Sequence, residues 1–143
     1  MLAVTMGDPA GIGGELTLAA WRDQRPAGLP PFLVVDDPAR LKHVSEQLGW
    51  EVPVHPISRA EEAKECFGEA LPVLAIEVPG VICAGVANPA NAGAVIGSIE
   101  KAVGLAMSGE VGGIVTQPVH KATLYGSGFS FPGHTEFLAY LTG

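Results

Sequence analysis

Two polar segments of the sequence contain side chains that could bind a small anionic molecule. Residues 131–136 (FPGHTE) place the imidazole of His134 and the hydroxyl of Thr135 after a Pro-Gly turn, at the start of an apolar helical stretch. The free N–H groups and the dipole at a helix N-terminus attract anions, so both side chains are candidate substrate ligands. Residues 116–121 (TQPVHK) end in Lys121, which could add a positive charge. The same three residues also fit structural roles, as a hydrogen-bonded histidine, a helix cap and a solvated lysine.

A glycine-rich segment, residues 7–14 (GDPAGIGG), follows the first apolar run of the chain. Its glycines would let backbone N–H groups approach a ligand at the start of the next helix. It is not a P-loop, because no Gly-Lys-Ser/Thr closes it. It also departs from the dinucleotide-binding fingerprint, because Leu16 stands where the third glycine belongs. The segment therefore predicts either a binding turn or a plain strand-to-helix turn.

Other residue types that could do chemistry are isolated from one another. Cys66 and Cys83 form no C-x-x-C pair, and their dissimilar surroundings favour free thiols in a reducing compartment. His43 falls on a predicted helix and His55 lies between prolines, so both are expected at the surface. No His or Cys spacing in this chain predicts a metal site.

The composition of the 143 residues excludes several classes of protein. Lys and Arg number 8 against 15 Asp and Glu, and the net charge of −7 repels the phosphate backbone of nucleic acids. With 48% hydrophobic residues, the chain is not a disordered tail. No apolar run reaches the roughly 20 residues of a membrane helix, and the N-terminus lacks the basic region of a secretory signal. We expect a cytoplasmic protein with one core and no nucleic-acid or membrane partner.

Short apolar runs alternate with amphipathic stretches along the chain. The runs predict strands at residues 2–6, 32–35, 52–57, 73–76 and 113–116, with 52–57 at an edge because of its two prolines. Helices are predicted at 15–21, 38–48, 92–108 and 136–141, and a capping-box pattern at 58–61 predicts a further short helix. Asn91 is expected to cap the longest helix, whose polar side includes Ser98. Strands separated by helices predict an α/β fold with a mainly parallel sheet covered on both faces.

Four motifs in register resemble the 4-hydroxythreonine-4-phosphate dehydrogenase family. They are TMGDPAGIG at residues 5–13, NPANA at 88–92, VTQPVHK at 115–121 and GHTEFLA at 133–139. The resemblance implies an α/β fold of the isocitrate/isopropylmalate-dehydrogenase type, with αβα layers around a mainly parallel sheet that is incomplete in this chain. By the family pattern His134 and Thr135 bind the substrate, and Lys121 is a candidate catalytic residue. A homodimer is also implied.

The resemblance further implies a reaction in pyridoxal phosphate biosynthesis. 4-Phosphooxy-threonine, a small phosphorylated substrate, is oxidised at its 3-hydroxyl by NAD, and the resulting β-keto acid loses CO₂ to give 3-amino-2-oxopropyl phosphate. The nicotinamide accepts the hydride. A divalent metal, usually zinc in this family, polarises the alcohol oxygen and stabilises the enolate.

Members of the family are considerably longer than this chain, and their metal-binding histidines lie downstream of the GHTE motif. We therefore expect residues 1–143 to be the N-terminal part of a longer dehydrogenase and to carry half of its substrate pocket. The metal-binding segment and most NAD-binding segments would then lie beyond Gly143. Alone, the chain is expected to be inactive and to expose apolar surface. Two alternatives stay open: a related dehydrogenase acting on 4-phospho-threonate or an aromatic cis-dihydrodiol, and a non-catalytic anion-binding module.

Overall fold

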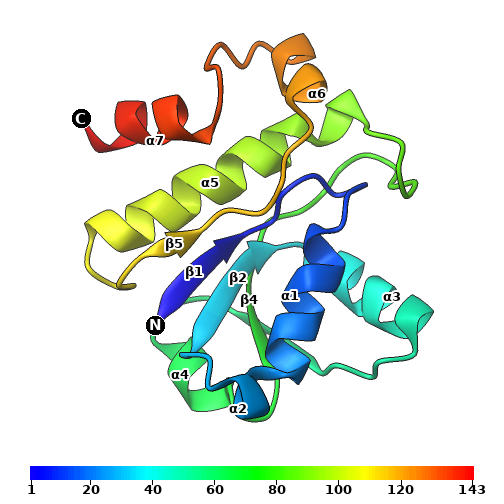
Figure 1. Cartoon of the computed structure of the whole chain (residues 1–143), viewed down its shortest axis with the longest axis vertical. Coiled ribbons are helices and arrows are strands. Elements are labelled where there is room, and N and C mark those ends of the chain that lie inside the picture. Colours follow the sequence, from blue (N-terminus) through cyan, green and yellow to red (C-terminus); the bar gives the residue numbers. More distant parts are fainter.

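One parallel sheet of five strands forms the centre of the chain (Figure 1). The computed structural model describes the backbone of residues 1–143 and the side chains of residues 1–24 and 27–143. The strands are β1 (Leu2–Thr5), β2 (Phe32–Asp36), β3 (Val54–Ile57), β4 (Leu71–Ala75) and β5 (Ile114–Val115), in the order β3-β4-β2-β1-β5. All neighbouring pairs are parallel, which confirms the predicted fold class. The proline-containing strand β3 lies at an edge, as predicted.

Helices cover both faces of this sheet and extend beyond it. They are α1 (Gly13–Arg22), α2 (Gln24–Ala27), α3 (Pro38–Leu48), α4 (Glu62–Cys66), α5 (Ala92–Met107), α6 (Lys121–Gly126) and α7 (His134–Thr142), with a 3₁₀ turn η1 at Pro89–Asn91. Figure 1 shows α1 and α3 on one face and α5 on the other, with α7 on the far side of α5 from the sheet. Each crossover thus returns the chain to a strand parallel to the one before it.

Alternate residues of the central strands supply two separate cores. On β2, Leu33 and Val35 pack with residues of α4 and α5, whereas Phe32 and Val34 pack with residues of α1 and α3. None of these four side chains is more than 5% exposed. A strand covered on both faces buries both sets of side chains, which explains why β2 is a continuous apolar run.

The ends of α3 follow the sequence signals. The carboxylate of Asp37 accepts hydrogen bonds from the N–H groups of Ala39 and Arg40, so it caps the helix. Gly49, with a φ of +64°, ends the helix in the left-handed conformation that glycine adopts without strain. The second carboxylate oxygen of Asp37 accepts from the N–H of Val78 and fastens the segment after β4 to this helix.

Two of the predicted caps are wrong. Asn91 makes no capping bond to α5, because its side-chain oxygen accepts from the N–H of Gly80 at 2.7 Å. The cap belongs one turn earlier, where Asn88 accepts from the N–H of Ala90 at the start of η1. The capping box over residues 58–61 is also displaced, since α4 begins at Glu62, whose carboxylate accepts from the N–H of Arg59.

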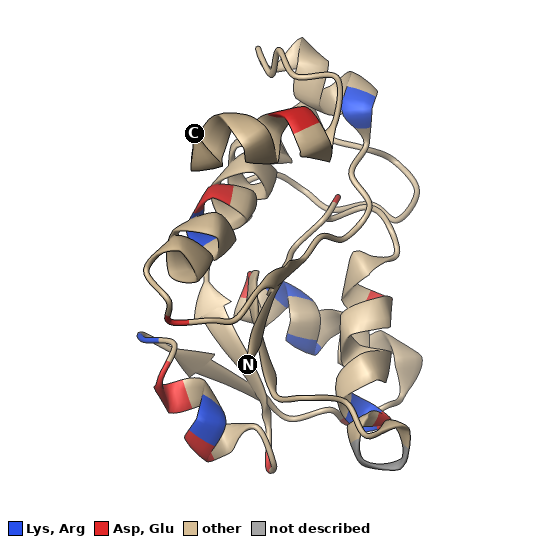
Figure 2. Cartoon of the chain, turned by 60° about the vertical axis from the view of Figure 1, so that its left-hand side comes forward, with Lys and Arg blue, Asp and Glu red and all other residues tan. Residues whose placement is uncertain are grey.

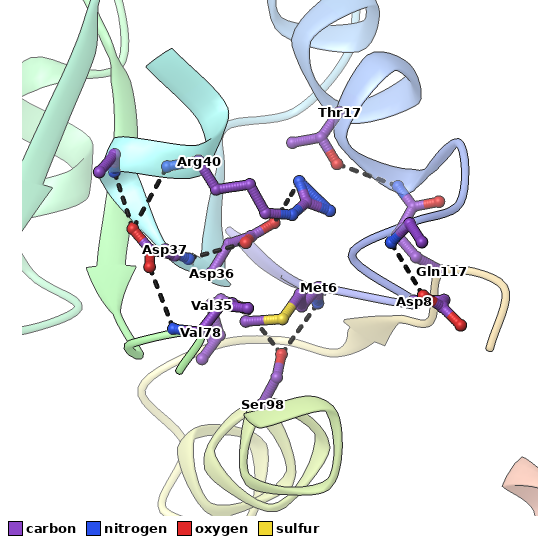
Figure 3. Close-up of polar contacts among 12 residues, drawn as sticks. Met6, Asp8, Thr17, Val35, Asp36, Asp37, Arg40, Val78, Ser98 and Gln117 are labelled. Atoms are coloured by element: carbon purple, nitrogen blue, oxygen red, sulfur yellow. Dashed lines mark hydrogen bonds and ion pairs between the residues drawn. The ribbon is translucent and has the colours of Figure 1, made fainter. Parts of the chain in front are cut away.

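Ser98 faces the core and not the solvent, contrary to the prediction from the helical pattern. Its hydroxyl donates to the carbonyl of Val35 at 2.7 Å and accepts from the N–H of Met6 at 2.9 Å (Figure 3). The side chain is fully buried. Both backbone groups lie where β1 and β2 end, and a buried polar group without a partner is costly. The serine on α5 therefore completes the hydrogen bonding at the carboxyl edge of the sheet.

Charged side chains are spread over several elements of the chain. In Figure 2 the basic residues stand singly or in small groups among acidic ones, with no extended basic face in this view. In the described part of the chain, no helix combines the length and the apolar composition needed to cross a lipid bilayer.

Candidate functional site

The turns after β1 and β5 meet at the carboxyl edge of the sheet. These two strands are neighbours, and the chain leaves β1 toward one side of the sheet and reaches β5 on the other. Such a switch point is where open α/β sheets bind ligands. The N–H of Asp8 donates to the carbonyl of Pro118 and joins the two turns. The turn after β5 is also bonded to β1 and α1, because the N–H of Gln117 donates to Thr5 Oγ1 and its side-chain amide donates to Thr17 Oγ1.

Gly7 allows this close approach of the two turns. Its φ is +69°, and a Cβ at this position would lie 2.7 Å from both the Gln117 Cβ and the Pro118 carbonyl oxygen. A side chain here would be strained in its backbone and would also push the turns apart. The glycine-rich segment is thus a strand-to-helix turn whose geometry builds the edge of a crevice.

The crevice encloses a cavity of about 280 Å³. Its lining is made by Asp8, Ala10, Gly11, Ile12, Gly85, Ala87, Pro118, Val119 and His120. A much smaller cavity beside it is lined by Asp8, His120 and residues of η1, α5 and α6. The larger volume is close to the lower end of the range for small-molecule sites.

The side chains of Asp8 and His120 line both cavities. The His120 Nδ1 lies 2.7 Å from the Oγ1 of Thr123, and this hydrogen bond holds the ring at the start of α6. Asp8 has a turn-forming role, because its carboxylate accepts from the N–H of Ala10 at 2.8 Å. His120 had no predicted role of its own, although it lies in the segment 116–121 that follows a predicted strand, a signal for a ligand-binding edge.

The structure brings Lys121 close to the turn that carries His134. A Cβ placed on Gly133 would lie 3.8 Å from the Lys121 Nζ. The Nε2 of His134 is buried and has no hydrogen-bond partner among the described residues. Burial lowers the pKa of His134, and the charge of Lys121 lowers it further. His134 is therefore a neutral imidazole beside an ammonium group.

His134 and Thr135 begin α7, as the sequence predicted. The helix starts at His134, its N-cap is Gly133, and no side chain caps it. Thr135 is exposed. We call Lys121, His134, Thr135 and the first turn of α7 the α7 cluster. Neither His134 nor Thr135 lines the two cavities around His120. The crevice and the α7 cluster are connected through α6, which His120 precedes and Lys121 begins.

Aromatic packing fixes the position of α7. Phe137 lies 5.0 Å from Phe129 and 5.1 Å from Phe131, measured between ring centroids. Phe137 also packs with Ile99 and Val103 of α5. The Tyr125 hydroxyl of α6 donates to the carbonyl of Pro132 at 3.1 Å. These contacts hold α7 against α5 and hold the turn before it against the end of α6.

The mouth of the crevice carries exposed apolar side chains. Ile12 is 60% exposed, Val81 81% and Val86 61%. The segment that contains the two valines is held to the glycine-rich turn by a hydrogen bond from the N–H of Gly85 to the carbonyl of Ala10. A crevice with a mainly apolar lining and an exposed apolar rim is typical of a surface that another molecule covers.

The remaining candidate residues lie apart. Cys66 and Cys83 are free thiols, and His43 and His55 are exposed, as predicted. Among the side chains that the structure describes, no group of three or more His, Cys, Asp or Glu could hold a metal ion.

The parallel sheet and the crevice at its switch point define an α/β protein with the geometry of a small-ligand site at the carboxyl edge of the sheet. Residues 29–143 match the family model described as pyridoxal phosphate biosynthetic protein PdxA. The chain belongs to this family.

Similar proteins agree with this membership. The 4-hydroxythreonine-4-phosphate dehydrogenase of Caulobacter vibrioides is 48% identical over 99% of this chain and 41% of its own length. That of Xanthobacter autotrophicus is 44% identical over 96% of this chain and 39% of its own length. The crystal structure of the Burkholderia phymatum 4-hydroxythreonine-4-phosphate dehydrogenase superposes with a TM-score of 0.90 at 32% identity, covering 99% of this chain and 43% of that one. The chain thus spans about two fifths of the length of these relatives.

Proposed function

We propose that this chain forms part of the substrate pocket of an NAD-dependent 4-hydroxythreonine-4-phosphate dehydrogenase. The reaction oxidises the 3-hydroxyl of 4-phosphooxy-threonine to a ketone, and the β-keto acid then loses CO₂ to give 3-amino-2-oxopropyl phosphate. The observation that carries the proposal is the α7 cluster, in which Lys121 and the partnerless Nε2 of His134 meet at an uncapped helix start. The names of the similar proteins support the substrate and a dehydrogenase reaction.

The α7 cluster would receive the negatively charged end of the substrate. The free N–H groups of the first turn of α7 and the ammonium group of Lys121 attract a phosphate or carboxylate. His134 is neutral, so it can donate or accept a hydrogen bond without adding charge. The exposed hydroxyl of Thr135 supplies another donor. Lys121 thus has a substrate-binding role, and a catalytic role would require its ammonium group to reach the reacting carbon atoms.

NAD is the proposed cofactor, and when bound it would accept the hydride from the substrate. The described residues do not fit a site for zinc or another divalent ion. We place the enzyme in the cytoplasm as a homodimer, with a pocket completed by segments outside these residues. The apolar rim of Ile12, Val81 and Val86 supports the idea that another part of the assembly covers the crevice.

Binding of 4-phosphooxy-threonine to the full chain, measured by isothermal titration calorimetry, tests the proposal. Lys121→Met and His134→Gln are each expected to weaken binding roughly tenfold, because each removes a hydrogen-bonding group from the α7 cluster. Lys101→Met and His55→Gln are matched controls, since both side chains are exposed on other elements. The proposal is wrong if the substrate does not bind, or if the controls weaken binding as much as the two cluster variants.

Catalysis is tested separately by following NADH formation. With substrate, NAD and zinc, the chain alone is expected to give no turnover, because it spans only about two fifths of its relatives. Turnover at a normal enzyme rate would show that these residues hold a complete active site. It would contradict the proposal that the chain forms only part of the pocket.

A further inference from the structure

A buried arginine lies beneath the glycine-rich turn, outside the crevice and the α7 cluster. The side chain of Arg40 is 3% exposed, and its three guanidinium nitrogens have no hydrogen-bond partner among the described residues. The nearest opposite charge is the Asp36 carboxylate, with 3.7 Å between Nη1 and Oδ2 (Figure 3). This separation is too long for a hydrogen bond. A buried guanidinium with none of its five donors engaged requires an acceptor from elsewhere.

Arg40 lines a cavity of about 140 Å³. The cavity is also lined by Pro9, Ala10, Gly11, Glu15, His43, Val44, Gln47, Ile82 and Ala84. The cavity lies between the glycine-rich turn and α3. It is separate from the crevice that contains His120, because the two linings share only Ala10 and Gly11. This volume suits a few water molecules or one small ion.

The start of α1 borders the same cavity. No side chain caps α1, so its first N–H groups lack the acceptor that a capping residue would supply. The guanidinium lies against this first turn, since a Cβ on Gly14 would come within 2.6 Å of the Arg40 Nη1. A glycine at position 14 thus lets a positive side chain reach the positive end of a helix dipole. Both groups favour the same type of ligand, an anion.

We propose that this cavity binds a small tetrahedral oxyanion, phosphate or sulfate, through the Arg40 guanidinium and the first N–H groups of α1. The site is distinct from the α7 cluster and does not depend on the proposed reaction. Two carboxylates oppose the anion, Asp36 beside Arg40 and Glu15 in the lining. The affinity is therefore set by the attraction of Arg40 and the N–H groups against the repulsion of these carboxylates.

Asp36 links anion binding to proton uptake. Burial raises the pKa of its carboxyl to about 7, against the lowering effects of Arg40 and of the N–H of Asp37. An oxyanion on Arg40 weakens the attraction that keeps Asp36 ionised, so binding is accompanied by protonation of Asp36. His43 and Glu15 line the same cavity and Asp37 adjoins it, so their charges enter the same balance.

The test is calorimetric titration of the full chain with sodium sulfate slightly above neutral pH, because the charge of sulfate is constant there. Runs in two buffers of different ionisation enthalpy give the number of protons taken up. We expect saturable binding with proton uptake. Asp36→Asn should tighten binding roughly tenfold, since it removes a charge beside the anion, and should abolish the proton uptake that Asp36 contributes.

Variants of Arg40 and Gly14 complete the test. Asp36→Asn combined with Arg40→Met avoids an unpaired buried carboxylate and should lose at least about tenfold in affinity relative to Asp36→Asn alone. Gly14→Ala should weaken binding with no change of charge, because its methyl group occupies the place of the guanidinium. Arg59→Met is the control, since that side chain is 74% exposed. AMP in place of sulfate shows whether the cavity accepts the phosphate of a larger molecule or only a free ion.

Three results would each overturn the proposal. They are no saturable sulfate binding, equal affinity with and without Arg40, and an unchanged affinity in Asp36→Asn. If the Lys121 and His134 variants lose substrate binding but still bind sulfate, the sulfate site and the α7 cluster are independent of each other.

Discussion

Replacing Asp36 by asparagine should remove a large part of the pH dependence of stability in this chain. Asp36 is 1% exposed at the end of β2, and its Oδ1 accepts from the N–H of Asp37 at 2.7 Å. Burial, only partly offset by Arg40 and by this N–H, raises the pKa of the carboxyl from 3.8 to about 7. Asparagine keeps the shape of the side chain and does not titrate.

The magnitude follows from the pKa shift. Between about pH 4 and 7 the folded chain holds a proton on Asp36 that the unfolded chain has released, so the stability falls as the pH rises. Each unit is worth about 1.4 kcal/mol, and the shift of about three units corresponds to a total of about 4 kcal/mol. Between about pH 5 and 7 the wild-type chain should lose about 2–3 kcal/mol through this group.

Urea unfolding at a series of pH values gives the free energy of unfolding of both chains. Other carboxylates titrate in both, so the difference between the wild type and Asp36→Asn isolates Asp36. The free energy of unfolding of Asp36→Asn minus that of the wild type should increase from acidic to slightly alkaline pH. Glu46→Gln, exposed on α3, the helix that carries Arg40, is the control and should give the same profile as the wild type. Parallel curves for the wild type and Asp36→Asn would refute the argument that burial dominates over the pairing with Arg40.

Three further substitutions test the fold around the crevice by urea unfolding. Ser98→Ala leaves two buried backbone groups unpaired and should cost about 1–3 kcal/mol, whereas Ser130→Ala on the surface should change little. Asp37→Ala removes the cap of α3 and should cost about 1–2 kcal/mol; no loss would show that water replaces the cap. Gly7→Ala should cost about 2–3 kcal/mol and weaken ligand binding in the crevice, because it adds strain and a steric overlap; a stable variant that binds normally would contradict this.

Local sequence signals predicted the structure correctly where it depends on residues that are close together in the chain. Asp37 followed by proline, and Gly49 after the last helical leucine, predicted both ends of α3, because caps depend on residues within one turn. The apolar runs predicted all five strands, and the two prolines predicted the edge position of β3. The Pro-Gly turn placed His134 and Thr135 at the start of the last helix, which begins two residues before the predicted range 136–141.

Predictions failed where a distant segment supplied the hydrogen-bond partner. Asn91 bonds to Gly80, and Ser98 bonds to Met6 and Val35. The pattern of α5 marked Ser98 as solvent-facing because serine is polar. Only the approach of two strand ends created buried groups that a hydroxyl could satisfy.

The sequence by itself determined the class of fold, the five strands, the helices between them and the family motifs, since periodicity and turn chemistry act over a few residues. It did not predict the short helices α2 and α6. The tertiary structure decided which of these motifs meet. Folding joined the turns after β1 and β5 into one crevice that includes His120 and placed Lys121 beside Gly133. It also buried Arg40 under the first turn of α1. The reason is physical: strand order and helix packing set distances between residues far apart in the chain, and the charge and burial of a side chain depend on those distances.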